Sequence, residues 1–236
     1  MIGQWMAAGF VHGVMNTDNF NITGETFDFG PYRFCETSDP NFTAAYFDQQ
    51  GLYRFGRQPG QGLWSLQQLA AALSHLSEVE DLAGALDSYE PAYQRSFASH
   101  TLALLGLLPK TLEEDLQFVA TFYAWMTESK ANWPQMFFDW FGGEASVDRA
   151  KESSQSHLYK ELAFDPIRTL IEARDPCDIH RLSHAYFQRP TPVNMLYDVI
   201  ENLWAPIADQ DDWSAFQSQL AHIEQARLAM ALDRSN

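Results

Sequence analysis

Residues 12–30 are the most informative part of this sequence and read His12-Gly13-Val14-Met15-Asn16-Thr17-Asp18-Asn19-Phe20-Asn21-Ile22-Thr23-Gly24-Glu25-Thr26-Phe27-Asp28-Phe29-Gly30. A tight turn is predicted at Thr23-Gly24, because glycine accepts the positive φ that two-residue hairpin turns need. Such a turn pairs Ile22 with Glu25, Asn21 with Thr26, Phe20 with Phe27, and Asn19 with Asp28. Directly opposed residues lie on one face, with Cβ atoms about 4.5–5.5 Å apart. The spacing therefore predicts a β-hairpin whose open end brings an amide and a carboxylate together.

The paired side chains of Asn19 and Asp28 suit a hard cation. Mg²⁺ typically takes one or two protein oxygens, and phosphates and waters complete its octahedron. Phe20 and Phe27 are predicted to face the other side and to anchor the hairpin on a core. The pattern thus predicts a magnesium site that faces a phosphate-bearing ligand.

Composition sets the wider limits on function. The chain has 236 residues, 46% of them hydrophobic, which describes a globular protein. Its net charge is −16 and it has no cluster of Lys and Arg, so nucleic acid and anionic membrane surfaces are not expected as partners. No apolar run of about 18 residues and no signal peptide is found, so no membrane segment is expected.

Only two cysteines, Cys35 and Cys177, are present. Two thiols in a chain of this length do not make a disulfide framework, so a reducing, cytoplasmic location is expected. Both thiols are expected to be inert.

The character of the chain changes near residue 60. Residues before it are rich in glycine and aromatic side chains, and residues after it show helical periodicity. Helices are predicted over 64–73 with Ser65 as cap, 82–97 with Pro91 as break or start, 112–126 behind the capping box of Thr111 and Glu114, 132–141, 191–206 and 213–232. Residues 144–157 are small and polar and predict a mobile loop. The aromatic cluster over 133–141 predicts helix-packing core.

A longer pattern surrounds the Asp28-Phe29-Gly30 triplet. Protein kinases carry His-x-Asp-x-x-x-x-Asn ahead of a metal-binding Asp-Phe-Gly. His12 and Asn19 meet the first and last positions of that pattern, but Val14 stands where the kinase catalytic aspartate belongs. Because valine cannot accept a proton, ordinary kinase chemistry is not expected.

The run Gly9-Phe10-Val11-His12-Gly13-Val14-Met15-Asn16-Thr17-Asp18-Asn19, followed by Gly24, Thr26 and Asp28-Phe29-Gly30-Pro31, resembles the selenoprotein O family. The resemblance is dense over residues 4–34 and weaker over 48–69. It implies a kinase fold without the usual catalytic aspartate, which binds ATP reversed and transfers AMP to Ser, Thr or Tyr hydroxyls of protein substrates. The expected fold is mainly α with a small β-hairpin, like a protein-kinase C-lobe, with the N-lobe absent from this chain.

The same resemblance assigns domains and roles. Residues 1–60 would form the catalytic loop, the metal-binding hairpin and a region like an activation segment, and residues 61–236 the helical C-lobe. Asn19 and Asp28 would hold Mg²⁺ or Mn²⁺ on the ATP phosphates. Asp18 would be the general base or orient the acceptor hydroxyl, although a turn or capping aspartate is its other interpretation. His12 is expected to support the loop by packing and hydrogen bonding.

Two departures from the family are evident. The lysine, glutamate and arginines of a kinase N-lobe have no counterpart here, so a missing N-lobe segment is an expected partner. The cysteines that relatives use for redox control are absent from residues 42–48 and from the chain end over 232–236, so that control is not expected. Two alternatives stay open: a non-catalytic pseudokinase module that binds nucleotide weakly or acts through protein contacts, and an orphaned fragment that self-associates.

Overall fold

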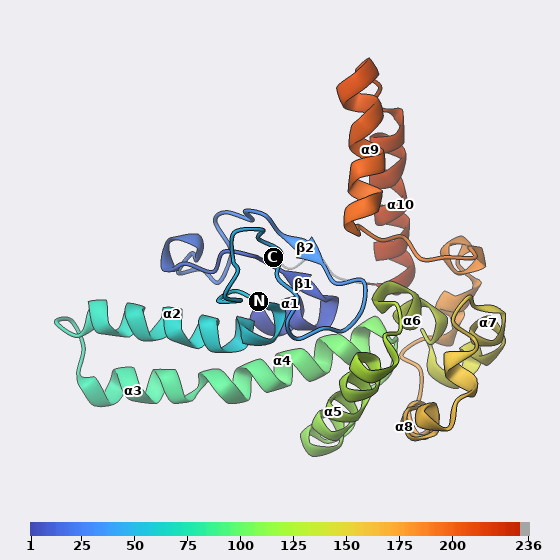
Figure 1. Cartoon of the computed structure of the whole chain (residues 1–236). Helices are drawn as coiled ribbons and strands as arrows, with labels where there is room; N and C mark the ends of the chain where they lie inside the picture. The colour runs from blue at the N-terminus through green and yellow to red at the C-terminus, as the bar shows by residue number, and fades with distance from the viewer. Residues whose placement is uncertain (232–236) are drawn as a thin grey trace. The chain divides into compact units, whose positions relative to one another are not determined.

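The computed structural model describes residues 1–231, which divide into two compact units (Figure 1). The first unit holds residues 1–35, 39–101 and 112–116, and the second holds 36–38, 102–111 and residues from 117 onward. These residues are mainly helical and contain one two-stranded antiparallel sheet, so the predicted helical content and the presence of a small β-element are confirmed. Within residues 1–231, no helix combines the length and the apolar character needed to span a membrane.

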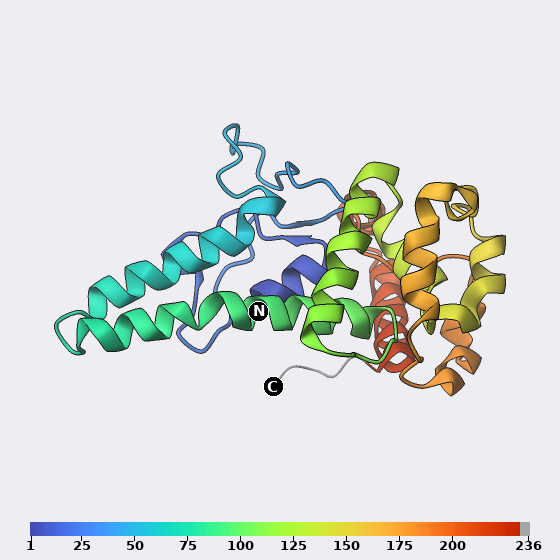
Figure 2. The same ribbon diagram turned by 90° about the horizontal axis from the view of Figure 1, so that it is seen from below.

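The first unit contains the predicted catalytic loop. Its elements are α1 (Ile2–Ala8), β1 (Phe10–Val11), the 3₁₀ turn η1 (Thr17–Asn19), β2 (Arg33–Phe34), the 3₁₀ turn η2 (Phe55–Arg57), α2 (Gln58–Leu73), α3 (Val79–Asp87) and most of α4 (Tyr89–Leu104). Helix α2 runs beside α3 and α4 in both views of the chain (Figures 1 and 2).

The boundaries of these helices follow the prolines. Helix α2 begins at Gln58 with Pro59 in its first turn, where the missing N–H costs nothing. The predicted cap Ser65 therefore lies inside the helix, and that prediction is wrong. Pro91 lies in the first turn of α4, so its expected role as a helix start is confirmed.

The sheet is not the predicted hairpin. Strands β1 and β2 pair antiparallel, with Phe10 opposite Phe34 and Val11 opposite Arg33. They therefore join the chain just before the catalytic loop to the chain just after Gly30. The Phe10 ring lies within 5.6 Å of the Tyr32 ring, measured between centroids, so aromatic packing supports the pairing.

The second unit is almost entirely helical. Its helices are the remainder of α5 (Leu112–Ser129), α6 (Trp133–Asp139), α7 (Val147–Glu152), α8 (Asp165–Glu172), α9 (Tyr197–Gln210) and α10 (Ser214–Met230). Its 3₁₀ turns are η3 (Gly143–Ser146), η4 (Leu158–Lys160), η5 (Leu162–Phe164), η6 (Ile179–Ser183) and η7 (Ala185–Gln188). Helices α9 and α10 pack side by side (Figures 1 and 2).

Several helix predictions are confirmed in this unit. Helix α5 begins directly after Thr111, and the Asn132 side chain caps α6 by accepting a hydrogen bond from the Gln135 N–H at 3.1 Å. Helix α9 begins at Tyr197, later than predicted. The predicted end of the last helix, at Leu232, lies outside the described residues, as does the predicted cysteine-free terminus over 232–236.

The prediction of a loop over residues 144–157 is wrong for residues 144–152, which η3 and α7 occupy, whereas residues 153–157 form a bend and turns. Arg149 explains why a polar stretch is ordered. Its Nη2 donates to the Phe141 carbonyl at 3.0 Å, and its guanidinium lies over the Phe138 and Phe187 rings at 5.0 and 4.9 Å. Stacking on aromatic rings orders a side chain that sequence polarity assigns to solvent.

The aromatic cluster predicted as core is buried. Its members Trp133, Met136, Phe137, Phe138, Trp140 and Phe141 are all 5% exposed or less. Asp139 is buried among them, accepting hydrogen bonds from Gln135 Nε2 and Tyr159 Oη at 2.7 Å each. Burial raises the pKa of Asp139, and the hydrogen bonds oppose that rise.

Candidate functional site

Residues 19–28 fold back on themselves, as predicted, but in a different register. We call them the ribbon. Its one ladder bridge pairs Phe20 with Thr26, and the Asn21 N–H donates to the Glu25 carbonyl at 2.9 Å. The loop thus has three residues, with Gly24 at φ +83°. The predicted two-residue turn and its pairing of Asn19 with Asp28 are wrong, because a three-residue loop closed by a left-handed glycine forms instead.

The change of register has a consequence for the aromatic residues. A shift of one residue moves side chains to the opposite face of a strand. Phe20 remains half-buried and stacks on Trp5, with ring centroids 6.4 Å apart. Phe27 is 76% exposed, so its predicted role as an anchor is wrong.

Asn19 and Asp28 are nevertheless joined, through the hydroxyl of Thr26. The Thr26 Oγ1 atom lies 3.0 Å from the main-chain carbonyl oxygen of Asn19 and 3.2 Å from the main-chain carbonyl oxygen of Asp28, so it links the backbone at these two residues and not their side chains. The Asn19 amide nitrogen donates to the Val14 carbonyl at 2.9 Å, and Asp28 Oδ1 accepts from the Gly30 N–H at 2.8 Å. Each side chain therefore keeps one oxygen, Asn19 Oδ1 and Asp28 Oδ2, that these bonds do not use.

That donor set fits a magnesium-like ion, which prefers hard oxygen ligands and few of them from protein. Within residues 1–231, no group of three His, Cys, Asp or Glu side chains forms a metal site of its own. Asn19 Oδ1 and Asp28 Oδ2 are hard oxygen donors of this kind, and their role as metal ligands stays a prediction.

Asp18 lies at the centre of η1 and is exposed to solvent. Its charge acts on Tyr53, whose hydroxyl donates to Asn16 Oδ1. The pKa of Tyr53 is raised, first by burial and then by the charges of Asp48 and Asp18. The carboxylate of Asp18 is therefore within electrostatic reach of a residue that is hydrogen-bonded to its own loop.

His12 is buried and connects Val14 to the ribbon by hydrogen bonds. Its Nδ1 accepts from the Val14 N–H at 3.3 Å, and its Nε2 lies 2.8 Å from Thr26 Oγ1. These contacts assign the neutral tautomer with the proton on Nε2, which then donates to Thr26. Burial lowers the pKa of His12, in agreement with a neutral ring. The rings of Trp5 and Phe29 lie 5.3 and 6.3 Å away, so the predicted supporting role is confirmed.

Gln58 is the residue of this site that sequence reasoning missed. Its side chain is fully buried, and both ends of its amide are used: Oε1 accepts from the His12 N–H at 2.9 Å and Nε2 donates to the Phe10 carbonyl at 2.8 Å. The start of α2 thereby fixes the entry to the catalytic loop. The Gln58-Pro59 pair belongs to the weaker part of the family resemblance, but no local pattern predicts two buried backbone partners, so only the fold reveals the role of Gln58.

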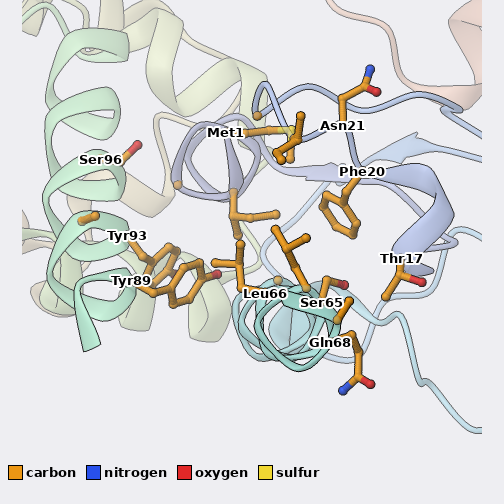
Figure 3. A pocket seen from close by; sticks show the side chains of 18 residues that line it. Met1, Thr17, Phe20, Asn21, Ser65, Leu66, Gln68, Tyr89, Tyr93 and Ser96 are labelled. Carbon is orange, nitrogen blue, oxygen red and sulfur yellow. The ribbon is translucent and has the colours of Figure 1, made fainter. Parts of the chain in front are cut away.

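A cavity of about 580 Å³ lies beneath the ribbon, between α1, α2 and α4. Figure 3 shows Phe20 from the ribbon, Leu66 from α2, and Tyr89 and Tyr93 from α4 turned toward it. The two tyrosine rings stack with centroids 6.3 Å apart. The cavity has a mainly apolar lining, and Phe20 is the aromatic side chain that the ribbon contributes to it.

Neither cysteine has the lowered pKa of an activated thiol. Cys35 is buried and burial raises its pKa to about 12, so the thiol stays protonated. Cys177 is exposed, and desolvation raises its pKa as well.

Comparison with known proteins points to the same family as the sequence motif of residues 9–31. The family described as "Protein adenylyltransferase SelO" matches residues 1–224. The chain belongs to this family. It is 32% identical over 230 residues to the "Protein nucleotidyltransferase YdiU" of Trichodesmium erythraeum, covering 94% of this chain and 48% of that protein. Its identity to proteins of the same name is 41% over 219 residues in Myxococcus xanthus, covering 91% and 44%, and 43% over 169 residues in Vibrio cholerae, covering 69% and 34%.

The chain spans about half the length of the curated relatives it matches. The family and these relatives are named for nucleotidyl transfer to proteins. The resemblance inferred from residues 4–34 is therefore confirmed and extends through residue 224.

Proposed function

We propose that this chain carries the metal- and base-bearing part of a protein adenylyltransferase, which transfers AMP from ATP to Ser, Thr or Tyr hydroxyls of other proteins. The observation that carries the proposal is the linkage of Asn19 and Asp28 through Thr26, each with a free oxygen, next to an exposed Asp18. The family's name supports the reaction class.

Each residue has one task in this reaction. Asn19 Oδ1 and Asp28 Oδ2 hold Mg²⁺ or Mn²⁺, which when bound supplies the positive charge that stabilises the phosphates. Asp18 accepts the proton of the acceptor hydroxyl. The hydroxyl oxygen forms a bond to the α-phosphorus of ATP, and the bond from that phosphorus to pyrophosphate breaks. Val14 leaves the usual kinase base position without a proton acceptor, which favours Asp18.

A further segment completes the site in this proposal. No Lys or Arg lies in residues 1–32, so the phosphate-binding cations would come from an N-lobe like that of kinases. We propose that the helical part of the chain is the corresponding C-lobe, working in a reducing, cytoplasmic setting.

The test uses the protein at its full natural length with ATP carrying a tagged AMP group. Asp28→Ala should lower labelling of protein hydroxyls by about 100-fold or more, because charge stabilisation at the phosphates is lost. Glu25→Ala is the matched control, since Glu25 lies on the exposed loop of the same ribbon. Equal labelling by the Asp28 variant and the wild type would refute the assignment. Nucleotide binding by calorimetry without any labelling would favour the pseudokinase alternative.

A further inference from the structure

No hydrogen bond holds the carboxylate of the candidate base Asp18. Within the described residues 1–231, neither a side chain nor a backbone N–H donates to it, and it is exposed to solvent. Its position therefore depends on the backbone of η1 (Thr17–Asn19), in which it is the central residue. A general base must lie within hydrogen-bond reach of the proton that it accepts. The contacts that fix η1 thus decide whether Asp18 can act.

The C-terminal end of η1 is fixed at Asn19 by the ribbon and by the loop. The Asn19 amide nitrogen donates to the Val14 carbonyl at 2.9 Å. The Asn19 carbonyl accepts from Thr26 Oγ1 and from the Phe27 N–H, at 3.0 Å each. The predicted metal ligand is therefore held by three bonds that do not involve the other end of η1.

The N-terminal end of η1 is held by a long-range contact. Asn16 is the N-cap residue of η1, but its side chain makes no capping hydrogen bond. Asparagine is favoured at helix N-caps because its oxygen can accept from the N–H groups of the first turn. Asn16 Oδ1 instead accepts from the hydroxyl of Tyr53, which lies 37 residues further along the chain. The start of η1 is thus fastened to the segment 41–54.

Tyr53 is placed by a turn that Asp48 organises. Asp48 Oδ1 accepts from the Leu52 N–H at 2.8 Å, and Asp48 Oδ2 accepts from the Tyr53 N–H at 2.7 Å. The Gly51 N–H donates to the Asp48 carbonyl at 3.2 Å, and Gly51 has φ +64°, a conformation that favours glycine. Three hydrogen bonds to one aspartate therefore order the turn that presents the Tyr53 hydroxyl to Asn16.

We propose that Tyr53 is a positioning residue for AMP transfer: by holding Asn16, its hydroxyl keeps η1 in the conformation in which Asp18 meets the acceptor hydroxyl. This inference rests on the proposed function and deepens it. Tyr53 acts through Asn16 and η1, and itself touches neither ATP nor the protein substrate in this scheme.

The protonation state of Tyr53 suits this task. Burial raises the pKa of its phenol, and the charges of Asp48 and Asp18 raise that pKa further. The hydroxyl therefore keeps the proton that it donates to Asn16 at neutral pH. A neutral phenol also places no second negative charge beside the Asp18 carboxylate.

The rest of the loop has restraints of its own, so loss of the Tyr53 hydroxyl should leave the fold intact. Gln61 Nε2 donates to the Met15 carbonyl at 3.2 Å, and Gln58 Oε1 accepts from the His12 N–H at 2.9 Å. These two contacts from α2 hold the chain before Asn16. The Tyr53 hydroxyl therefore controls η1 alone, which makes its effect measurable in a folded protein.

The test is steady-state labelling by the full-length protein with tagged ATP. Tyr53→Phe, which removes only the hydroxyl oxygen, should lower kcat about fivefold, the effect of one hydrogen bond. The KM for ATP should stay unchanged, because Asn19 and Asp28 keep their own restraints. Tyr46→Phe is the matched control, since Tyr46 is a 90% exposed tyrosine of the same segment whose hydroxyl has no hydrogen bond within residues 1–231.

A double-mutant cycle tests whether the effect passes through Asn16. Asn16→Ala should lower kcat to a similar extent, and adding Tyr53→Phe should cause no further fall, because both changes remove the same hydrogen bond. Additive losses would show that the two residues act separately and would overturn the inference. A fall in kcat with an equal rise in the KM for ATP would also overturn it, because it would reveal a general distortion of the site.

The wild type separates this inference from the proposed function. If the wild type labels no protein, the proposed function fails and no base remains to be positioned. If the wild type labels protein and Tyr53→Phe labels it at the same rate, only the inference fails. A lower kcat in Tyr53→Phe and in Asn16→Ala, without additivity and with Tyr46→Phe unchanged, supports it.

Discussion

One neutral imidazole organises the catalytic loop at the scale of single residues. His12 receives the Val14 N–H and gives its own proton to Thr26, whose hydroxyl lies between the carbonyls of Asn19 and Asp28. The two predicted metal ligands are therefore held through a hydrogen-bond chain that starts at a buried ring. Replacement of His12 or Thr26 should therefore increase the mobility of Asn19 and Asp28 together.

The lowered pKa of His12 makes stability depend on pH. The unfolded chain takes up a proton near the ordinary pKa of 6.5, whereas the folded ring resists protonation to lower pH because it is buried. The unfolded state thus binds more protons below pH 6.5, and the free energy of unfolding falls as the pH drops, by at most about 1.4 kcal/mol per pH unit.

Urea unfolding at about pH 7 and about pH 5.5 tests this sign. His12→Gln should lose part of the decrease, while His75→Gln, at an exposed position, should keep all of it. An identical pH dependence in the wild type and the His12 variant would contradict the assignment of a neutral ring.

At the scale of single residues, the sequence predicts most of the candidate site residues. The pattern of His12, Asn19 and Asp28 is visible in the sequence, and so is the valine at the kinase base position. Gln58 is not, because its importance comes from two backbone partners, at Phe10 and His12, that only the fold brings to it.

At the scale of elements, α2 is fastened to the catalytic loop by the Gln58 amide. Gln58→Leu would leave the His12 N–H and the Phe10 carbonyl buried without partners, which costs about 1–3 kcal/mol for each group. We expect a lower midpoint of urea unfolding and a lower kcat for AMP transfer. Gln67→Leu, on the exposed side of the same helix, is the control. Unchanged stability in Gln58→Leu would show that the hydrogen bonds from Gln58 to the backbone of His12 and Phe10 do not stabilise the fold.

The ribbon gives a second prediction at this scale, about its loop. Gly24 has φ +83° and open space around it, so only backbone strain opposes a side chain. Gly24→Asn should be nearly neutral, because asparagine tolerates the left-handed region, whereas Gly24→Val should cost about 1–2 kcal/mol. Thermal unfolding of the two variants measures the difference. Equal costs would argue against a positive φ at Gly24.

Sequence periodicity predicts the existence of these elements better than their register. A turn at residues 23–24 and one at 22–24 differ by a single residue, and both place glycine at a positive φ. The stack of Phe20 on Trp5 favours the observed register, and that contact joins residues too far apart for local patterns to reveal. The ordered stretch at 143–152 was missed for the same reason, since Arg149 is held by distant aromatic rings.

At the scale of the whole molecule, the described chain has two compact, mainly helical units. Its net charge of −16 makes it a poor host for a triphosphate unless cations are supplied. If the proposed function holds, nucleotide binding should depend on a divalent metal that offsets this charge. We expect calorimetric titration with ATP and no metal to give little heat.

The most direct measurement is calorimetric titration of the full-length protein with ATP and Mg²⁺, for the wild type, Asn19→Ala, Asp28→Ala and the control Glu25→Ala. We expect metal-dependent binding that is retained in the Glu25 variant and weakened at least about tenfold in the Asn19 and Asp28 variants. Binding of equal strength in all four proteins, or binding that ignores the metal, would contradict it.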